Sequence, residues 1–244
     1  MSGPPRPLRI AHGYGNRRDR VEEAVQGGAD LVEADLRYRA GEVWVRHEHR
    51  LPLLPVLYNW RLSATHRAGP WALSLGPLFL RLDVDRLRLR ELVENVSGRC
   101  GLLLDLKADR YSDCEARALV ERALAAVDGF AGTLAFCGSW RLLDITREMR
   151  PQAWLHYAVD SAEQWRAIQP RLGGEAAVRG ITVRLSLLSE DRAAALREAG
   201  IRFFCWDVHS LPEAERAAAL GAAGIIAGEI EVLRALAESR RVER

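Results

Sequence analysis

Short apolar runs alternate with longer amphipathic segments along most of this chain. The short runs have the composition of buried strands, and the longer segments repeat their apolar residues at helical spacing. Ser161, Ser189 and Ser210 stand at expected helix N-termini, where serine is a favoured cap. Strands are predicted at 8–12, 30–38, 101–107, 133–137, 153–159, 180–185, 202–208 and 224–228, with helices at 18–28, 85–96, 114–127, 139–150, 161–172, 189–200, 210–221 and 229–244.

The regular alternation of strands and helices determines how the strands pair. A strand–helix–strand repeat favours a parallel sheet, because each helix carries the chain back to the start of the next strand. Eight such units in 244 residues fit a closed (β/α)₈ barrel, or TIM barrel, with a β-hairpin extension after the second strand. The alternative is an open, doubly wound sheet. No GxGxxG sequence follows the first strand, so a dinucleotide site has no support.

The stretch from residue 30 to residue 49 carries two carboxylates within an apolar run. Glu33 and Asp35 are two residues apart, so on a strand both side chains leave on the same face. The chain then turns at residues 39–41 and returns as a second strand that ends near His47. Such a hairpin brings a carboxylate pair and an imidazole together, a combination that suits a hard cation and proton transfer. The alternative is a surface hairpin with solvated acids.

Residues 50–82 show neither periodicity clearly. They contain four prolines, and tryptophans stand at positions 60 and 71. We expect an irregular loop over about 50–82 that covers the mouth of a pocket, with simple packing as the alternative. The whole chain, residues 1–244, is expected to form a single domain.

Composition narrows the class of partner. The chain has 35 Lys and Arg against 33 Asp and Glu, a net charge of +2, which gives no electrostatic case for nucleic acid. Its four cysteines lack metal-binding spacing and are expected to be free thiols in a reducing compartment. The N-terminus has no apolar signal core, and no apolar run of about 18 residues predicts a membrane span. We expect a soluble, cytoplasmic protein.

Polar residues gather at the predicted carboxyl ends of the strands, where the catalytic groups of a (β/α)₈ barrel stand. A buried carboxylate is costly unless it is paired or bound to a cation, so Glu33, Asp35 and Asp105 are predicted to hold a metal ion. Lys107 would offset leftover charge or hold an anionic substrate. The alternatives are an ordinary Asp105–Lys107 ion pair, and core or surface roles for the other candidates. Those candidates are His12, His47, Arg184 and Trp206.

Several short motifs follow one another in a definite order. They are Ala11-His12-Gly13, Gly28-Ala29-Asp30, Glu33-Ala34-Asp35, His47-Glu48, Asp105-Leu106-Lys107, Trp206-Asp207-Val208-His209 and Gly221 to Ile226. This ordered set resembles the glycerophosphodiester phosphodiesterase family over nearly the whole chain. Gly13 stands where that family keeps a phosphate-binding arginine, and Asp105 replaces its glutamate. The aspartate and the short segment after His47 are closer to the sphingomyelinase D branch of the same phospholipase C-like superfamily.

The resemblance implies a metal-dependent phosphodiesterase. In it, Glu33, Asp35 and Asp105 hold Mg²⁺ or Ca²⁺, and His12 and His47 act as general acid and base, in an order that stays open. The implied substrate is a small glycerophosphodiester, a deacylated phospholipid, cleaved to an alcohol and glycerol phosphate. Two alternatives are a phospholipase D-like reaction that forms a cyclic phosphate and a non-catalytic barrel that binds a phosphorylated ligand. The residues expected to hold the substrate are Lys107, Arg17, Arg184 and Trp206.

Overall fold

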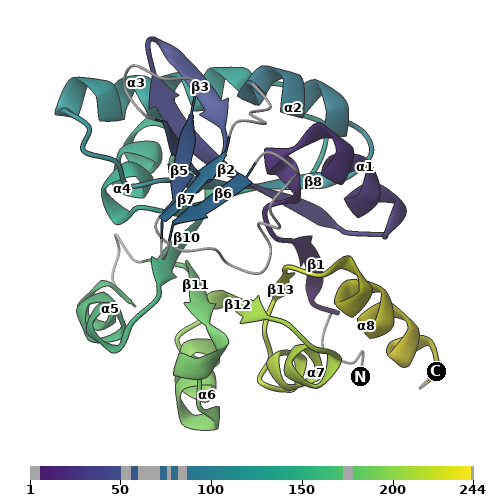
Figure 1. Cartoon of the computed structure of the whole chain (residues 1–244). Helices are drawn as coiled ribbons and strands as arrows, with labels where there is room; N and C mark the ends of the chain where they lie inside the picture. The colour runs from purple at the N-terminus through teal and green to yellow at the C-terminus, as the bar shows by residue number, and fades with distance from the viewer. Residues whose placement is uncertain are drawn as a thin grey trace.

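The computed structural model describes residues 6–50, 56–59, 72–75, 78–81, 87–172 and 178–242. Eight parallel strands form a barrel, which closes because β1 pairs with both β13 and β2. Figure 1 shows helices around the outside of these strands. The predicted TIM barrel is confirmed, and the open-sheet alternative is wrong. The barrel strands are β1 (Leu8–Ala11), β2 (Leu31–Arg39), β8 (Gly101–Leu106), β9 (Leu134–Gly138), β10 (Trp154–Val159), β11 (Gly180–Arg184), β12 (Arg202–Val208) and β13 (Gly224–Ala227).

A helix follows each barrel strand before the next one begins. Ser161, Ser189 and Ser210 cap three of these helices as predicted, since each hydroxyl accepts the backbone N–H three residues ahead. The second helix begins at Leu89, and Arg88, which the prediction placed inside it, is its extended N-cap. The helices are α1 (Arg18–Gln26), α2 (Leu89–Val96), α3 (Asp113–Ala126), α4 (Trp140–Met149), α5 (Ala162–Ile168), α6 (Glu190–Glu198), α7 (Leu211–Ala219) and α8 (Ile230–Val242), with 3₁₀ turns η1 (Tyr14–Asn16), η2 (Gln169–Arg171) and η3 (Leu185–Leu187).

The barrel strands are apolar on both faces because they separate two buried regions. One region lies between strands and helices and is the larger apolar cluster. The smaller cluster fills the inside of the barrel and includes Ile10, Leu31, Leu103, Phe204 and Ile226. This double burial explains why the strands appear in the sequence as near-continuous apolar runs.

The predicted hairpin extension is also confirmed. Strand β3 (Glu42–Val45) runs antiparallel to the second half of β2, with Arg39 opposite Glu42. The turn between them places Ala40 and Gly41 at positive φ, 51° and 80°. The return arm therefore starts at the far end of β2 and brings the chain back toward the barrel.

A four-stranded antiparallel sheet follows the hairpin, in the order β4-β5-β7-β6. Its strands are β4 (His49–Arg50), β5 (Leu57–Asn59), β6 (Ala72–Leu75) and β7 (Leu78–Arg81). The expectation of an irregular loop is therefore wrong for these residues, and the rest of that segment lies outside the described residues. The strands are too short for alternation to be visible in the sequence.

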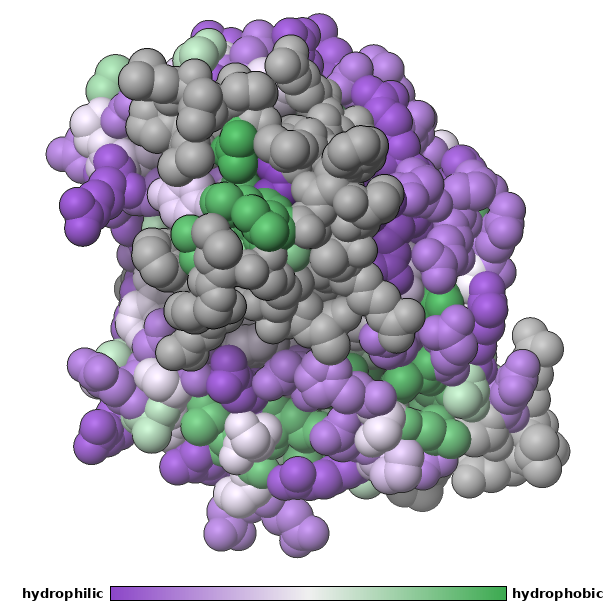
Figure 2. All heavy atoms as spheres, in the orientation of Figure 1, coloured by the Kyte–Doolittle hydropathy of each residue, from purple (hydrophilic) through white to green (hydrophobic). Residues whose placement is uncertain are grey.

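A buried ion pair joins β7 of this small sheet to the short segment between β3 and β4. The Arg81 Nη1 lies 2.9 Å from the Glu48 Oε1, and both side chains are almost fully buried. On the outside, Leu73 is 56% exposed. Figure 2 shows apolar atoms in green over the region where Figure 1 places β5, β6 and β7.

Two further expectations concern the whole chain. All four cysteines are free, as predicted. Among the described residues, none of the helices combines the length and the apolar character that a bilayer crossing requires. That residues 1–244 form a single domain stays a prediction.

Candidate active site and metal centre

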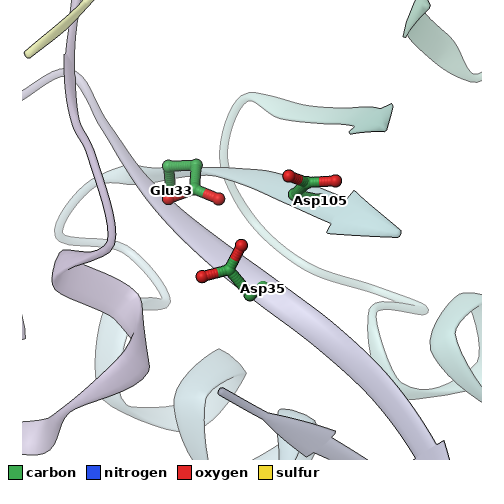
Figure 3. Close-up of side chains that lie close together, drawn as sticks. All are labelled: Glu33, Asp35 and Asp105. Carbon is green, nitrogen blue, oxygen red and sulfur yellow. The ribbon is translucent and has the colours of Figure 1, made fainter. Parts of the chain in front are cut away.

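Three carboxylates meet inside the carboxyl end of the barrel. Glu33 and Asp35 are on the inner face of β2, two residues apart. The parallel register of β2 and β8 places Asp105 directly beside Asp35. One oxygen from each of the three carboxyl groups lies within 4.8 Å of the others. Figure 3 shows the three side chains gathered between β2 and β8, where the sequence predicted a shared site.

Lys107 partly balances the charge of this group. Its Nζ lies 2.6 Å from Asp35 Oδ1 and 2.5 Å from Asp105 Oδ2. Burial alone would lower the pKa of Lys107, but the charge of Asp105, then of Asp35 and Glu33, raises it well above its usual value. Lys107 therefore stays charged, and its ammonium lies between the two aspartates.

Glu33 is the carboxyl group with the least compensation. It is only 3% exposed and accepts a hydrogen bond from the Gly13 N–H at 2.5 Å. Burial, and then the charge of Asp35, raises the pKa of Glu33 well above its usual value. A divalent cation would remove this penalty, because three carboxylates with one lysine leave an excess of negative charge. The all-oxygen donor set fits a hard cation such as Mg²⁺ or Ca²⁺.

Asn16 fixes Asp35 from the side of η1, a contact that sequence reasoning missed. Its Nδ2 donates to Asp35 Oδ2, and its Oδ1 accepts the Asp35 backbone N–H at 2.9 Å. The turn packs closely on β2 at Gly15, where a Cβ would lie 2.6 Å from the Cβ of Ala34. The only sequence signal was the position of Asn16, which follows Gly13 and Gly15 after a predicted strand and precedes a predicted helix.

Gly138 makes room for Asp105 at the end of β9. A Cβ at this position would lie 2.1 Å from Asp105 Oδ1, and the backbone has a φ of +105° that favours glycine. The neighbouring strand thus leaves the third carboxylate in place only because it ends in glycine.

The two predicted histidines follow the ends of β1 and β3. The His12 Nε2 lies 4.0 Å from Glu33 Oε2, and its side chain is 26% exposed. His47 is partly buried, one residue beyond Arg46, whose N–H donates to the Asp35 carbonyl at 2.8 Å. The structure therefore brings His12 beside the acids and the backbone of His47 next to the strand that carries two of them.

Arg184 and Trp206 lie together on the opposite part of the rim. The Arg184 guanidinium is 4.6 Å from the centre of the Trp206 ring, and its Nε is 3.8 Å from Asp207 Oδ2. Trp206 also hydrogen-bonds Asp160 at the end of β10. Surrounding protein atoms displace water from the Asp160 carboxylate and so raise its pKa, and the negative charge of Asp105 raises it further. Asp160 and Asp105 line the same cavity, which links this side of the rim to the acids.

Arg17 makes its closest described contacts away from the acids. Its Nη2 lies 2.7 Å from Asp19 Oδ2, and its Nε donates to Asp19 Oδ1 at 3.0 Å. Its expected role in substrate binding stays a prediction.

A cavity of about 460 Å³ opens beside the carboxylate cluster. Asp105 and Lys107 form part of its wall, and Trp140, Asp160 and Glu163, on the segments after β9 and β10, form another part. The Trp140 indole N–H donates to the Ala158 carbonyl at 2.7 Å, which fixes the ring. A small group attached to a ligand at the acids has room here.

Comparison with known proteins gives a likeness in structure only. No protein-family model and no curated protein sequence matches the chain. Solved structures do match over nearly the full length. A Silicibacter pomeroyi protein assigned to the glycerophosphoryl diester phosphodiesterases has a TM-score of 0.75 at 19% identity, covering 98% of this chain and 96% of that one.

Two other structures agree. A glycerophosphodiester phosphodiesterase from Thermotoga maritima has a TM-score of 0.67 at 19% identity, covering 95% of this chain and 99% of its own. An Oleispira antarctica phosphodiesterase, solved with the product sn-glycerol-3-phosphate, has a TM-score of 0.68 at 14% identity, with 97% of each chain covered. The chain has the fold of the glycerophosphodiester phosphodiesterases. The resemblance predicted from the motifs is confirmed at the level of the fold.

Proposed function

We propose that this protein is a metal-dependent phosphodiesterase that hydrolyses glycerophosphodiesters to an alcohol and glycerol phosphate. The observation that carries the proposal is the cluster of Glu33, Asp35 and Asp105 with Lys107, at the carboxyl end of the barrel. A buried group of this charge is costly to keep without a cation.

The three carboxylates would hold Mg²⁺ or Ca²⁺. When bound, the ion would supply Lewis-acid activation of a phosphate oxygen and lower the pKa of the attacking hydroxyl. Asn16 and Lys107 keep Asp35 oriented for this role, and Gly138 leaves space for Asp105.

His12 and His47 would move the protons. His12 is close to Glu33 yet partly open to solvent, so it can exchange a proton with water between turnovers. One imidazole would take the proton of the attacking hydroxyl, and the other would give a proton to the leaving alcohol. The base removes the proton of the attacking oxygen as that oxygen becomes positively charged. The acid donates a proton that neutralises the negative charge developing on the leaving oxygen.

Lys107 would hold the phosphate, with Arg184 and Trp206 on the far side of the rim. Gly13 supplies no side chain, and its N–H is engaged with Glu33, so the ammonium of Lys107 carries more of this task. Arg17 would contact the phosphate only after its ion pair with Asp19 breaks. The cavity beside Asp105 would receive the alcohol of the substrate.

Phosphorus NMR with glycerophosphocholine tests the proposal. We expect glycerol phosphate to form when Mg²⁺ or Ca²⁺ is present and not after chelation. His12→Ala and His47→Ala should each slow turnover by at least about 100-fold, since general acid–base catalysis contributes this much. Full activity after either substitution would reject the assignment.

The same spectra separate the alternatives. A cyclic phosphate product would indicate the phospholipase D-like reaction, in which an internal hydroxyl attacks. Binding of glycerophosphocholine in calorimetry with no product at any metal concentration would indicate a non-catalytic barrel.

A further inference from the structure

A buried arginine continues the row of charged residues along the inner face of β2. Arg37 stands two residues after Asp35 and four after Glu33, so its side chain leaves β2 on the same face. It is 6% exposed. We infer that Arg37 is a positioning residue that fixes His47 relative to Lys107. The inference rests on the role proposed above for His47.

One side of the Arg37 guanidinium is committed to the backbone of His47. Its Nε donates to the His47 carbonyl oxygen at 3.1 Å, and its Nη2 donates to the same oxygen at 2.7 Å. Two donors from one rigid plane restrict the peptide in both distance and orientation. A shift of His47 would therefore break both bonds at once.

The other side of the guanidinium is anchored to the segment after β8. Arg37 Nη1 donates to Asp109 Oδ1, and the Tyr111 hydroxyl donates to Asp109 Oδ2 at 2.8 Å. The Tyr111 oxygen accepts the Tyr38 N–H at 2.9 Å, which ties this segment back to β2. The Asp109 N–H donates to the Lys107 carbonyl at 3.0 Å. Arg37 thus bridges the two segments that carry His47 and Lys107.

Asp109 is held in the form that this bridge requires. Burial is the largest single influence and opposes its charge, but the hydrogen bond and the charge of Arg37, with the Tyr111 hydrogen bond and the charge of His49, together outweigh burial and lower the pKa of Asp109. The carboxylate stays ionised and keeps the guanidinium in place. Removal of either partner would leave the other charge largely buried.

His49 extends the bridge to the small sheet. Its Nδ1 lies 3.6 Å from Asp109 Oδ1, and its Nε2 lies 3.4 Å from Arg37 Nη2. The ring also stacks on Tyr58 of β5, with centroids 5.4 Å apart. Burial, and then the charge of Arg37, lowers the pKa of His49, so the neutral ring can accept from Arg37. Arg37 therefore contacts both His49, at the start of β4, and the backbone of His47, the predicted acid–base residue.

A double-mutant cycle tests whether Arg37 acts through His47. We would measure kcat and KM with glycerophosphocholine by phosphorus NMR, because its alcohol is a poor leaving group and turnover then depends on both the acid and the base. Arg37→Gln is expected to lower kcat by about 10- to 100-fold with little change in KM, the range seen when a supporting hydrogen bond is lost. In the His47→Ala background the same change should cost less than about twofold, since coupled residues are not additive.

Arg37→Lys distinguishes a loss of His47 positioning from a loss of folded protein. Lysine keeps the charge beside Asp109 but loses the planar fork, so thermal melting should be near that of the wild type while kcat still falls. Asp109→Asn should reproduce the kcat loss from the other end of the bridge.

Arg171→Gln is the matched control. Arg171 donates to Asp144, and Asp144 also accepts a hydrogen bond from the Tyr157 hydroxyl, so the group has the same three residue types as Arg37, Asp109 and Tyr111. This substitution should leave kcat unchanged. Equal losses from Arg37→Gln in both His47 backgrounds, or no loss in either, would overturn the inference. Wild-type activity in His47→Ala alone would instead reject the role proposed for His47.

Discussion

Lys107 is the only lysine among the 35 lysine and arginine residues of the chain. Its position between Asp35 and Asp105 gives this choice a physical reason. A compact ammonium can contact one oxygen of each carboxylate, whereas a guanidinium would cover both oxygens of one of them. Lysine therefore offsets charge and still leaves carboxylate oxygens that can face a cation.

His156 is a second residue whose surroundings decide its behaviour. It is fully buried inside the barrel, and its ring stacks on Phe204 with centroids 3.8 Å apart. Its Nδ1 lies 3.2 Å from the Ile181 carbonyl. Burial lowers the pKa of His156 to about 3. The neutral imidazole serves here as a flat core residue and takes no part in the site.

We predict that His156 makes the fold sensitive to acid. Between pH 6.5 and 3 the unfolded chain binds a proton that the folded chain does not, so the free energy of unfolding falls as pH falls. At pH 5 this loss is about 2 kcal/mol relative to pH 7. Urea unfolding at both pH values should show it, and His156→Phe should remove most of the difference. An unchanged pH dependence in that variant would contradict the assignment.

At the scale of elements, Gly138 shows how one strand protects a site carried by another. Gly138→Ala would place a methyl group against Asp105, and we predict loss of most metal-dependent activity. Gly129→Ala is the control, because Gly129 also has positive φ, +73°, but a Cβ there meets nothing within 4 Å. Both substitutions cost about 1–2 kcal/mol of backbone strain. Only Gly138→Ala should abolish activity, measured by phosphorus NMR beside thermal melting.

The barrel strands were predictable because burial on both faces produces long apolar runs. Glu33, Asp35 and Asp105 were predictable as a group because strand spacing and strand ends determine their positions. Asn16 and Arg37 were not, since their contacts depend on the path of a turn and on the segment after β8. The small sheet was missed because strands of two to four residues show no periodicity.

Across the whole molecule, the carboxylate cluster couples the proposed activity to stability. Three acids and one lysine keep unbalanced charge inside a barrel whose other interior residues are mostly apolar. Such charge lowers the stability of the metal-free fold, and a bound cation would restore it. The stable state and the active state would then be the same metal-loaded state.

Glu33→Gln tests this coupling. Glutamine has the shape of protonated glutamate and can still accept the Gly13 N–H, so the metal-free variant should melt at or above the temperature of the metal-free wild type. Added Mg²⁺ or Ca²⁺ should stabilise the wild type by about 3 kcal/mol at 100 times its dissociation constant, and the variant much less. Thermal melting over a metal titration measures both effects. Glu22→Gln on α1, an exposed acid paired with Arg99, is the control and should respond to metal like the wild type. If Glu33→Gln gained as much from metal as the wild type, these acids would not be the binding site.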